Sequence, residues 1–187
     1  MGVAVGGDDG DLQAASAISG GYPPSGAAAA NTTGTFLSVG RRNAWGEYSV
    51  LTSLLRFDTS AVPDGATVTS ATLRLHVAGK ADGDDRNLVA EWYPAANWPI
   101  DDADYALDSS ASALPGADVG NLALGAVNDL ALQGLGAVST TGSTALRLHL
   151  DGGQPAADNY VTPRTSATIA PNDRGLSAIF LRALSEM

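Results

Sequence analysis

Residues 53–77, SLLRFDTSAVPDGATVTSATLRLHV, contain two runs of alternating apolar and polar side chains, one on each side of a turn. A period of two indicates β-strands that are buried on one face. The apolar positions of the two runs are Leu55, Phe57, Leu73, Leu75 and Val77. Between the runs, Pro63 presets a turn dihedral and Gly65 tolerates a positive φ. The stretch predicts two half-buried strands, so the rest of the chain must supply the layer that covers them.

The same alternation returns at residues 145–150, where three leucines face one way while Arg147 and His149 face the other. Further short strands are expected at residues 35–39, 48–51, 88–93, 128–132, 160–162 and 177–183. A polar loop at 40–46, hairpin loops at 80–87 and 151–159, and a helical turn at 134–139 separate them. Many short strands with turn signals and no βαβ alternation predict an all-β fold. We expect an antiparallel jelly-roll β-sandwich with an N-terminal arm and at most one or two short helical turns.

The first 30 residues differ from the rest in composition, because alanine and glycine dominate them. We therefore expect an N-terminal arm at residues 1–30 and a sandwich domain at residues 31–187. One short strand is expected around residues 12–18. The arm is either a loosely ordered tail or a segment that docks on a neighbouring subunit.

Charge and composition exclude several classes of protein. Twenty acidic residues against ten basic ones give a formal net charge of −10, which argues against binding to nucleic acid or to an anionic membrane. The absence of cysteine excludes disulfides and thiolate chemistry. No apolar run approaches the length of a membrane span, and the acidic N-terminus does not resemble a Sec signal peptide.

Residues 36–40, 54–60 and 62–75, together with the stretch from Trp92 to Trp98, resemble the DNRLRE-type β-sandwich modules. These modules occur in bacterial surface proteins, polysaccharide-degrading enzymes and phage virion proteins. The resemblance covers residues 34–184, although residues 171–183 lack the usual closing motif of the family. It implies a jelly-roll sandwich without catalytic residues, and some relatives are described as carbohydrate-binding.

Acidic loops are candidate cation sites, because Ca²⁺ binds six to eight oxygen atoms. We expect no cofactor, with a structural Ca²⁺ as the alternative, held by Asp82, Asp84 and Asp85. Two further acidic clusters are candidates for the same role: Asp8, Asp9 and Asp11, and Asp101, Asp102 and Asp104. None has the spacing of an EF-hand, so solvated turn residues are the competing interpretation.

Arginine and tryptophan in loops are candidate binding residues, since both are favoured anchors at interfaces. The residues selected are Arg41, Arg42, Trp45 and Trp98. Trp45 and Trp98 could instead stack on sugars, whereas Trp92 lies in an expected strand and suits the core. The two histidines, His76 and His149, are expected on outer faces of strands, and no Gly-x-Ser-x-Gly nucleophile motif exists.

Two functions are therefore compared, and neither is enzymatic. The first is a bacteriophage virion protein, a capsid-decoration or tail-associated subunit that contacts other subunits and forms a homo-oligomer, located in the virion. The alternative is a carbohydrate-binding module of a secreted or cell-surface protein. No partner among nucleic acids or membranes is expected for either function.

Overall fold

The computed structural model describes residues 2–5, 10–17, 21–24, 29–32, 36–94, 96, 98–105, 111–164 and 178–184. The strands along the chain are β1 (Gly2–Val5), β2 (Gly10–Ala17), β3 (Ala29–Asn31), β4 (Val39–Ala44), β5 (Glu47–Asp58), β6 (Thr67–Asp82), β7 (Asn87–Tyr93), β8 (Ala111–Asp118), β9 (Ala126–Leu132), β10 (Ser143–Leu150), β11 (Asn159–Pro163) and β12 (Ala178–Leu184). Short 3-10 turns are η2 (Asp102–Tyr105), η3 (Val119–Asn121) and η4 (Leu135–Ala137). The predicted all-β fold is confirmed, but these three turns exceed the one or two expected.

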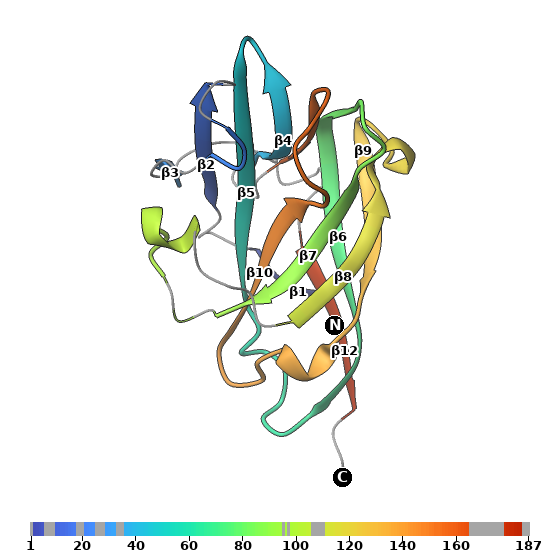
Figure 1. Cartoon of the computed structure of the whole chain (residues 1–187). Coiled ribbons are helices and arrows are strands. Elements are labelled where there is room, and N and C mark those ends of the chain that lie inside the picture. Colours follow the sequence, from blue (N-terminus) through green and yellow to red (C-terminus); the bar gives the residue numbers. More distant parts are fainter. Residues whose placement is uncertain are drawn as a thin grey trace.

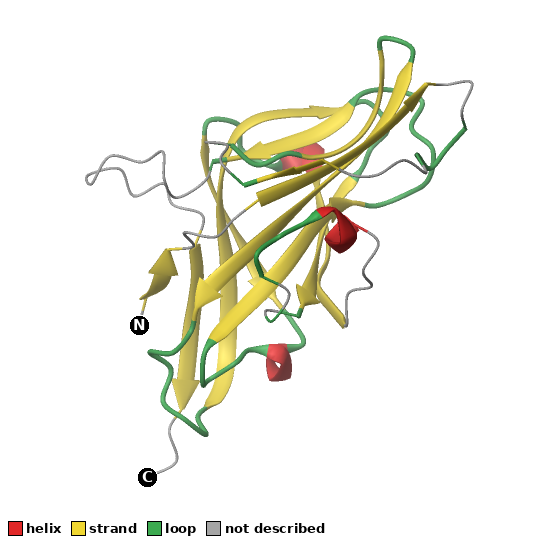
Figure 2. Cartoon of the chain, turned by 90° about the vertical axis from the view of Figure 1, so that its left-hand side faces the viewer, coloured by secondary structure: helices red, strands yellow, loops and turns green. Residues whose placement is uncertain are grey.

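The strands form one antiparallel sheet in the order β1-β12-β6-β11-β4-β5-β10-β7-β8 (Figure 1). β9 pairs with β6, and the amide of Gln133, just after β9, donates to the carbonyl of Ala113 in β8 at 2.8 Å. The sheet therefore curls until it nearly closes, like a barrel. In Figure 2 the long strands run from the end that holds both termini to the opposite, loop-rich end.

The interior of this curled sheet is the main core, and the alternating leucines build it. Leu73, Leu75 and Val77 of β6 are fully buried, as are Leu146 and Leu148 of β10. Leu55 and Phe57 of β5 belong to the same core, so both alternating runs that flank the turn at 62–65 face it, as the sequence predicts. At that turn the amide of Ala66 donates to the carbonyl of Pro63 at 3.0 Å, and Gly65 has φ +75°.

A second, smaller core lies on the other side of β5. It contains Leu12 of β2, Leu54 of β5 and Ala145 of β10, with Tyr93 and Ile100. β2 pairs with β5 over eight positions, from Gly10 opposite Leu54 to Ala17 opposite Glu47. The strand expected around residues 12–18 is therefore present, and it is part of the sheet of its own chain.

Two of the expected hairpins are wrong. Residues 83–86 connect β6 to β7, and residues 151–158 connect β10 to β11, yet neither pair of consecutive strands is hydrogen-bonded together. Turn residues mark where a strand ends, but not which strand lies beside it. The loop expected at 40–46 is also too long, because β4 continues to Ala44. β8 falls in a region where no strand was expected.

Candidate functional site

The tip of the β4–β5 hairpin carries the most exposed tryptophan of the described residues. Ala44 pairs with Glu47, so only Trp45 and Gly46 form the loop. Their φ angles are +52° and +81°, the pattern of a type I′ turn, which normally uses Asn-Gly or Gly-Gly. A bulky side chain in this conformation is strained. The indole of Trp45 is nevertheless 93% exposed.

Arg42 of β4 lies near this indole. Its Nε and Nη2 donate to the two carboxylate oxygens of Asp158 at 2.7 and 2.8 Å. The guanidinium lies 5.7 Å from the ring centre of Trp45 and 5.1 Å from that of Tyr160. The hydrogen bonds to Asp158 raise the pKa of Arg42, so this guanidinium stays charged. The tip therefore presents an exposed aromatic side chain next to an arginine that is paired with Asp158.

A pocket of about 220 Å³ lies next to the same arginine. Its lining comes from β4, β5 and β11 and from Ser38, which precedes β4. The lining residues are Ser38, Val39, Arg42, Leu51, Tyr160, Val161 and Thr162. Because Arg42 both lines the pocket and contacts Trp45, the exposed indole and the pocket belong to one surface, which we call the tip surface.

Arg41 does not belong to the tip surface. Its Nε donates to the carbonyl of Leu150 at 2.7 Å, and its Nη1 donates to the hydroxyl of Tyr22. The structure thus brings together Arg42 and Trp45 of the predicted contact residues and directs Arg41 into contacts within the fold.

Trp98 is also separate from the tip. It is half-buried against Tyr93, with ring centres 6.2 Å apart, and the guanidinium of Arg56 lies 5.0 Å from its ring centre. Arg56 and Glu47, next to the tip, are nine positions apart on β5, which is about 30 Å along a strand. The two tryptophans therefore do not form one platform. Trp92 is buried, as expected, and its Nε1 donates to the carbonyl of Gln133 at 3.0 Å.

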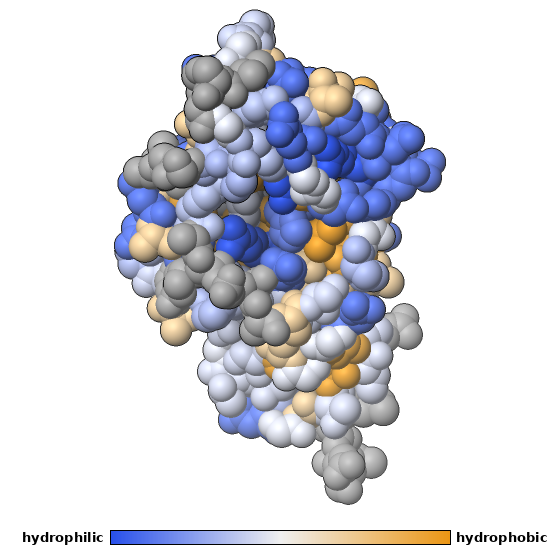
Figure 3. All heavy atoms as spheres, in the orientation of Figure 1, coloured by the Kyte–Doolittle hydropathy of each residue, from blue (hydrophilic) through white to orange (hydrophobic). Residues whose placement is uncertain are grey.

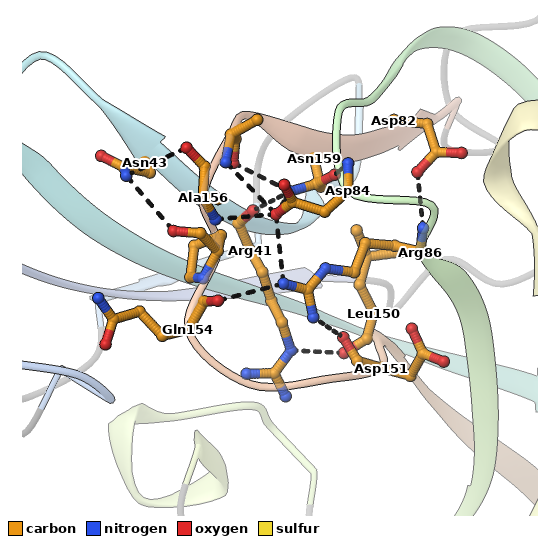
Figure 4. A network of polar contacts seen from close by, with 12 residues as sticks. Arg41, Asn43, Asp82, Asp84, Arg86, Leu150, Asp151, Gln154, Ala156 and Asn159 are labelled. Atoms are coloured by element: carbon orange, nitrogen blue, oxygen red, sulfur yellow. Dashed lines mark hydrogen bonds and ion pairs between the residues drawn. The ribbon is translucent and has the colours of Figure 1, made fainter.

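The acidic loop after β6 forms a network that we call the Arg86 clamp, consisting of Asp84, Arg86, Asp151 and Asn159 (Figure 4). Arg86 is only 8% exposed, and its guanidinium donates to the carbonyls of Asp151 and Gln154 at 3.0 and 3.3 Å. It also lies 3.3 Å from the carboxylate of Asp84. The clamp joins the loops that follow β6 and β10.

One carboxylate oxygen of Asp84, Oδ2, accepts several hydrogen bonds. Its Oδ2 accepts from the amides of Ala156 and Ala157 at 2.9 and 3.3 Å and from Nδ2 of Asn159 at 2.9 Å. Burial raises the pKa of Asp84, but these donors and Arg86 outweigh it and hold the pKa below its usual value. The carboxylate is therefore ionised and paired with protein groups.

Asp82, Asp84 and Asp85, which the sequence predicts as cation ligands, have separate surroundings in the described structure. Asp82 accepts from the amide of Arg86 at 2.7 Å, and Asp85 is exposed at φ +55°. Among the described residues, no group of three or more acidic, histidine or cysteine side chains lies where it could hold a metal. The guanidinium of Arg86 supplies the positive charge that the sequence suggested a Ca²⁺ would bring.

The other acidic clusters also have structural contacts. Asp8 and Asp9 lie outside the described residues. Asp104 is buried and accepts from the hydroxyl of Tyr93 and the amide of Asp101, the latter at 2.7 Å. Asp102 accepts from the amide of Ala30 at 3.1 Å.

Asp11 is a buried residue whose Oδ1 accepts a hydrogen bond from Nδ2 of Asn31 at 3.3 Å. Burial raises its pKa to about 6, against the lowering effect of the Asn31 hydrogen bond.

The two histidines lie on different strands that do not pair. His76 of β6 faces Val127 of β9, and His149 of β10 has its Nε2 3.4 Å from the carboxylate of Glu91. They do not form a pair with each other. Within the part of the chain that is described, no helix is long and apolar enough to cross a membrane.

Sequence reasoning missed the Arg86 clamp, because Asp84 and Asn159 are 75 positions apart and no local pattern links them. The hairpin tip did carry a signal, since a residue followed by glycine between two alternating strands indicates a two-residue turn.

Comparison with known proteins gives no family for this chain. No protein-family model matches it, and no curated protein matches its sequence. The resemblance to the DNRLRE-type modules stays a prediction.

Proposed function

We propose that this chain is a non-catalytic structural module that acts through contacts with other protein subunits, as a capsid-decoration or tail-associated protein of a bacteriophage does. The observation that carries the proposal is Trp45, 93% exposed at a strained turn, with the guanidinium of Arg42 5.7 Å from its ring centre. Neither the exposure nor the strain helps the chain to fold, and strain of this kind is found at functional sites. Tryptophan and arginine are also the side chains that most often dominate protein interfaces.

The polar groups at the loop-rich end support a non-catalytic role. Oδ2 of Asp84 and the two terminal nitrogens of Arg86 bind each other and backbone groups of the 151–158 loop, while the buried Nε of Arg86 has no hydrogen-bond partner among the described residues. Such contacts hold loops in place and leave these side chains committed to the fold. The choice of a virion protein over other assembly proteins comes from the resemblance to the DNRLRE-type modules and from the acidic surface, which keeps assembled particles apart.

The proposal is tested by the mass of the purified chain in solution. Analytical ultracentrifugation and light scattering over a wide concentration range are expected to show a defined homo-oligomer in reversible equilibrium with the monomer. A chain that is monomeric at every concentration would count against a self-assembling subunit.

A carbohydrate-binding module is the second candidate, favoured by the pocket that Arg42 lines and by the exposed indole near the same arginine. Ser38, Thr162 and Arg42 add polar atoms around the ring of Tyr160, and this combination suits a sugar with one apolar face. A glycan array with wild-type protein and Trp45→Ala separates the candidates. Binding that disappears in the variant favours the sugar, and a silent array removes it.

A further inference from the structure

We propose that Asp11 makes the attachment of β2 and β3 to the rest of the sheet sensitive to pH. The two strands are held firmly while the carboxyl group of Asp11 is protonated, and they open locally once it is ionised. The inference goes beyond the proposed function and does not depend on it, because it concerns a movement within one chain.

β2 and β3 form a small unit at the margin of the fold. Within the described strands β3 pairs with β2 alone, and β2 pairs with β5. Of the buried side chains described, those of the main core include none from either strand, and those of the smaller core include Leu12. Tyr22, between the two strands, is tied to Arg41 of β4 and packs on Tyr48 of β5. The unit can therefore open without disturbing the main core, and the tie at Tyr22 keeps it close for reclosure.

Asp11 lies at the junction of this unit with the sheet. The residue is 7% exposed, and the strand register places it opposite Ser53 of β5 and Asn31 of β3. Among the described residues one side-chain donor reaches its carboxylate, Nδ2 of Asn31 at 3.3 Å. The hydroxyl of Ser53 donates elsewhere, to the carbonyl of Ser38 at 3.0 Å. An ionised carboxylate here lacks the cation, or the about two to three donors, that normally offset the loss of water.

No cation on the described elements around β2 offsets this charge. β2 packs against β3, β5 and η2, whose titratable or charged residues are Glu47, Tyr48, Arg56, Asp58, Asp102, Asp104 and Tyr105. Arg56 is the one cation of this set. It is three positions from Ser53, so it leaves the opposite face of β5, and it lies 5.0 Å from the ring centre of Trp98. In Figure 3 hydrophilic residues gather at the upper right, over the loops that follow β6 and β10 in Figure 1, whereas β2 lies on the left.

The direction of the pH effect follows from the burial of Asp11. Burial raises the pKa of Asp11 from the usual 3.8 to about 6, against the lowering effect of the Asn31 hydrogen bond. The attached state thus holds the proton more tightly than the open state, in which the carboxyl group returns to water. Attachment is therefore strongest below about pH 4 and weakens by about 100-fold as the pH rises from about 4 to about 6. By contrast, hydrogen bonds from Arg74 hold the pKa of Asp129 below its usual value, so this ion pair between β6 and β9 persists over the same range.

Hydrogen exchange read by mass spectrometry tests the proposal segment by segment, at pH 4 and pH 7 with EDTA present. After correction for intrinsic exchange rates, wild-type peptides from residues 10–17 should open about 100-fold more at pH 7, while peptides from β6 and β10 change little. Asp11→Asn cannot ionise, so its peptides should open to the same extent at both pH values. The matched control is Asp102→Asn, since Asp102 also holds β3, through the amide of Ala30 at 3.1 Å. An amide oxygen can still accept this bond, so the wild-type pH dependence should remain.

The titration of Asp11 itself gives a second readout that needs no substitution. Its carboxyl carbon, followed by NMR in the wild-type chain, should titrate with a midpoint near 6. Histidine is the usual source of pH dependence in this range, but His76 lies on β6 and His149 on β10, and neither strand pairs with β2. Thermal melting shows that each variant is folded.

The outcomes are distinct from those that test the proposed function, because none of them depends on the oligomeric state. Equal protection of residues 10–17 at both pH values in wild type would overturn the proposal. A pH dependence that survives in Asp11→Asn would assign it to another group and overturn it as well. Protection restored at pH 7 by added Ca²⁺ would make Asp11 a cation ligand, again against the proposal.

Discussion

Arg42 and Arg86 both bind a carboxylate near the 151–159 segment, yet the two pairs do different things. The pair of Arg86 and Asp84 is buried, with side chains 10% and 15% exposed, and it joins two loops that are distant in sequence. The pair of Arg42 and Asp158 is shorter, 2.7 Å against 3.3 Å, but 29% and 34% exposed. Judged by the N–O distance alone, the pair of Arg42 and Asp158 would be taken for the more stabilising one. The pair of Arg86 and Asp84 is less exposed and has further hydrogen-bond partners, so it stabilises the fold. The pair of Arg42 and Asp158 is more exposed and lies next to Trp45.

Removing the carboxylate from each pair should have the largest effect and the clearest contrast. Asp84→Ala removes the carboxylate next to the buried guanidinium of Arg86 and the acceptor of two backbone amides, so the free energy of unfolding should fall by about 3 kcal/mol. Asp158→Ala breaks an exposed pair and should cost less than about 1 kcal/mol. Urea denaturation of both variants measures the difference. Equal losses would mean that the two arginines do not differ as described.

Asp11 is a buried carboxylate whose ionisation should lower the stability of the fold. Its pKa of about 6 in the folded chain lies above the usual 3.8, so the folded state holds the proton more tightly than the unfolded state. Its contribution is therefore most favourable below pH 4 and is lost as the pH rises from about 4 to about 6. At pH 8 Asp11→Asn should stabilise the chain by up to about 3 kcal/mol, with little gain at pH 4. Melting temperatures at the two values check this. A gain of equal size at both would show that the charge is not the cause.

Two glycines with the same backbone conformation sharpen the comparison between clamp and tip. Gly152 has φ +82°, and a Cβ there would lie 1.8 Å from Nη1 of Arg86; Gly46 has φ +81° and open space around it. Gly46→Ala should cost about 1 kcal/mol from the left-handed conformation alone. Gly152→Ala adds displacement of a hydrogen-bonded guanidinium and should cost about 2 kcal/mol or more. Similar values from denaturant titrations would show that Arg86 moves aside freely.

The smallest expected effect is a gain in stability at the tip. Trp45→Asn places a residue that suits the type I′ turn at an exposed position, so the free energy of unfolding should rise by about 0.5–1 kcal/mol. Chemical denaturation measures it, with Trp45→Ala as the control that lacks the turn preference. A loss above 1 kcal/mol would show that the indole stabilises its own subunit through Arg42.

The features that sequence could predict are those set by local periodicity. The leucines of β6 and β10 alternate because one face of each strand is buried, and the structure places them in one core. Leu54 could not be assigned in this way, since its burial depends on β2 and Ile100 packing on the far side of β5. The connections between strands failed for a related reason. Asp82-Gly83 ends β6, but local sequence does not show that the chain then crosses to β7 instead of pairing back.

At the candidate site, the residue types were informative and their contacts were not. Arg42 and Trp45 could be predicted as binding residues because both are typical interface anchors, but the same reasoning also predicts Arg41. Alternation along β4 separates the neighbours, since Arg41 and Arg42 point to opposite faces of the strand. The role of Arg86 could not be predicted, because an acidic loop looks the same in sequence whether a cation or an arginine of the same loop neutralises it.

The pairing of β1 with β12 places the first and last strands of the sheet side by side. Figure 1 shows both ends of the chain far from the β4–β5 tip. A fluorescent tag, a surface tether or a displayed peptide fused to either end would therefore point away from Trp45. The fold could therefore carry a fused group at the end near β1 and β12 while the β4–β5 tip stays accessible.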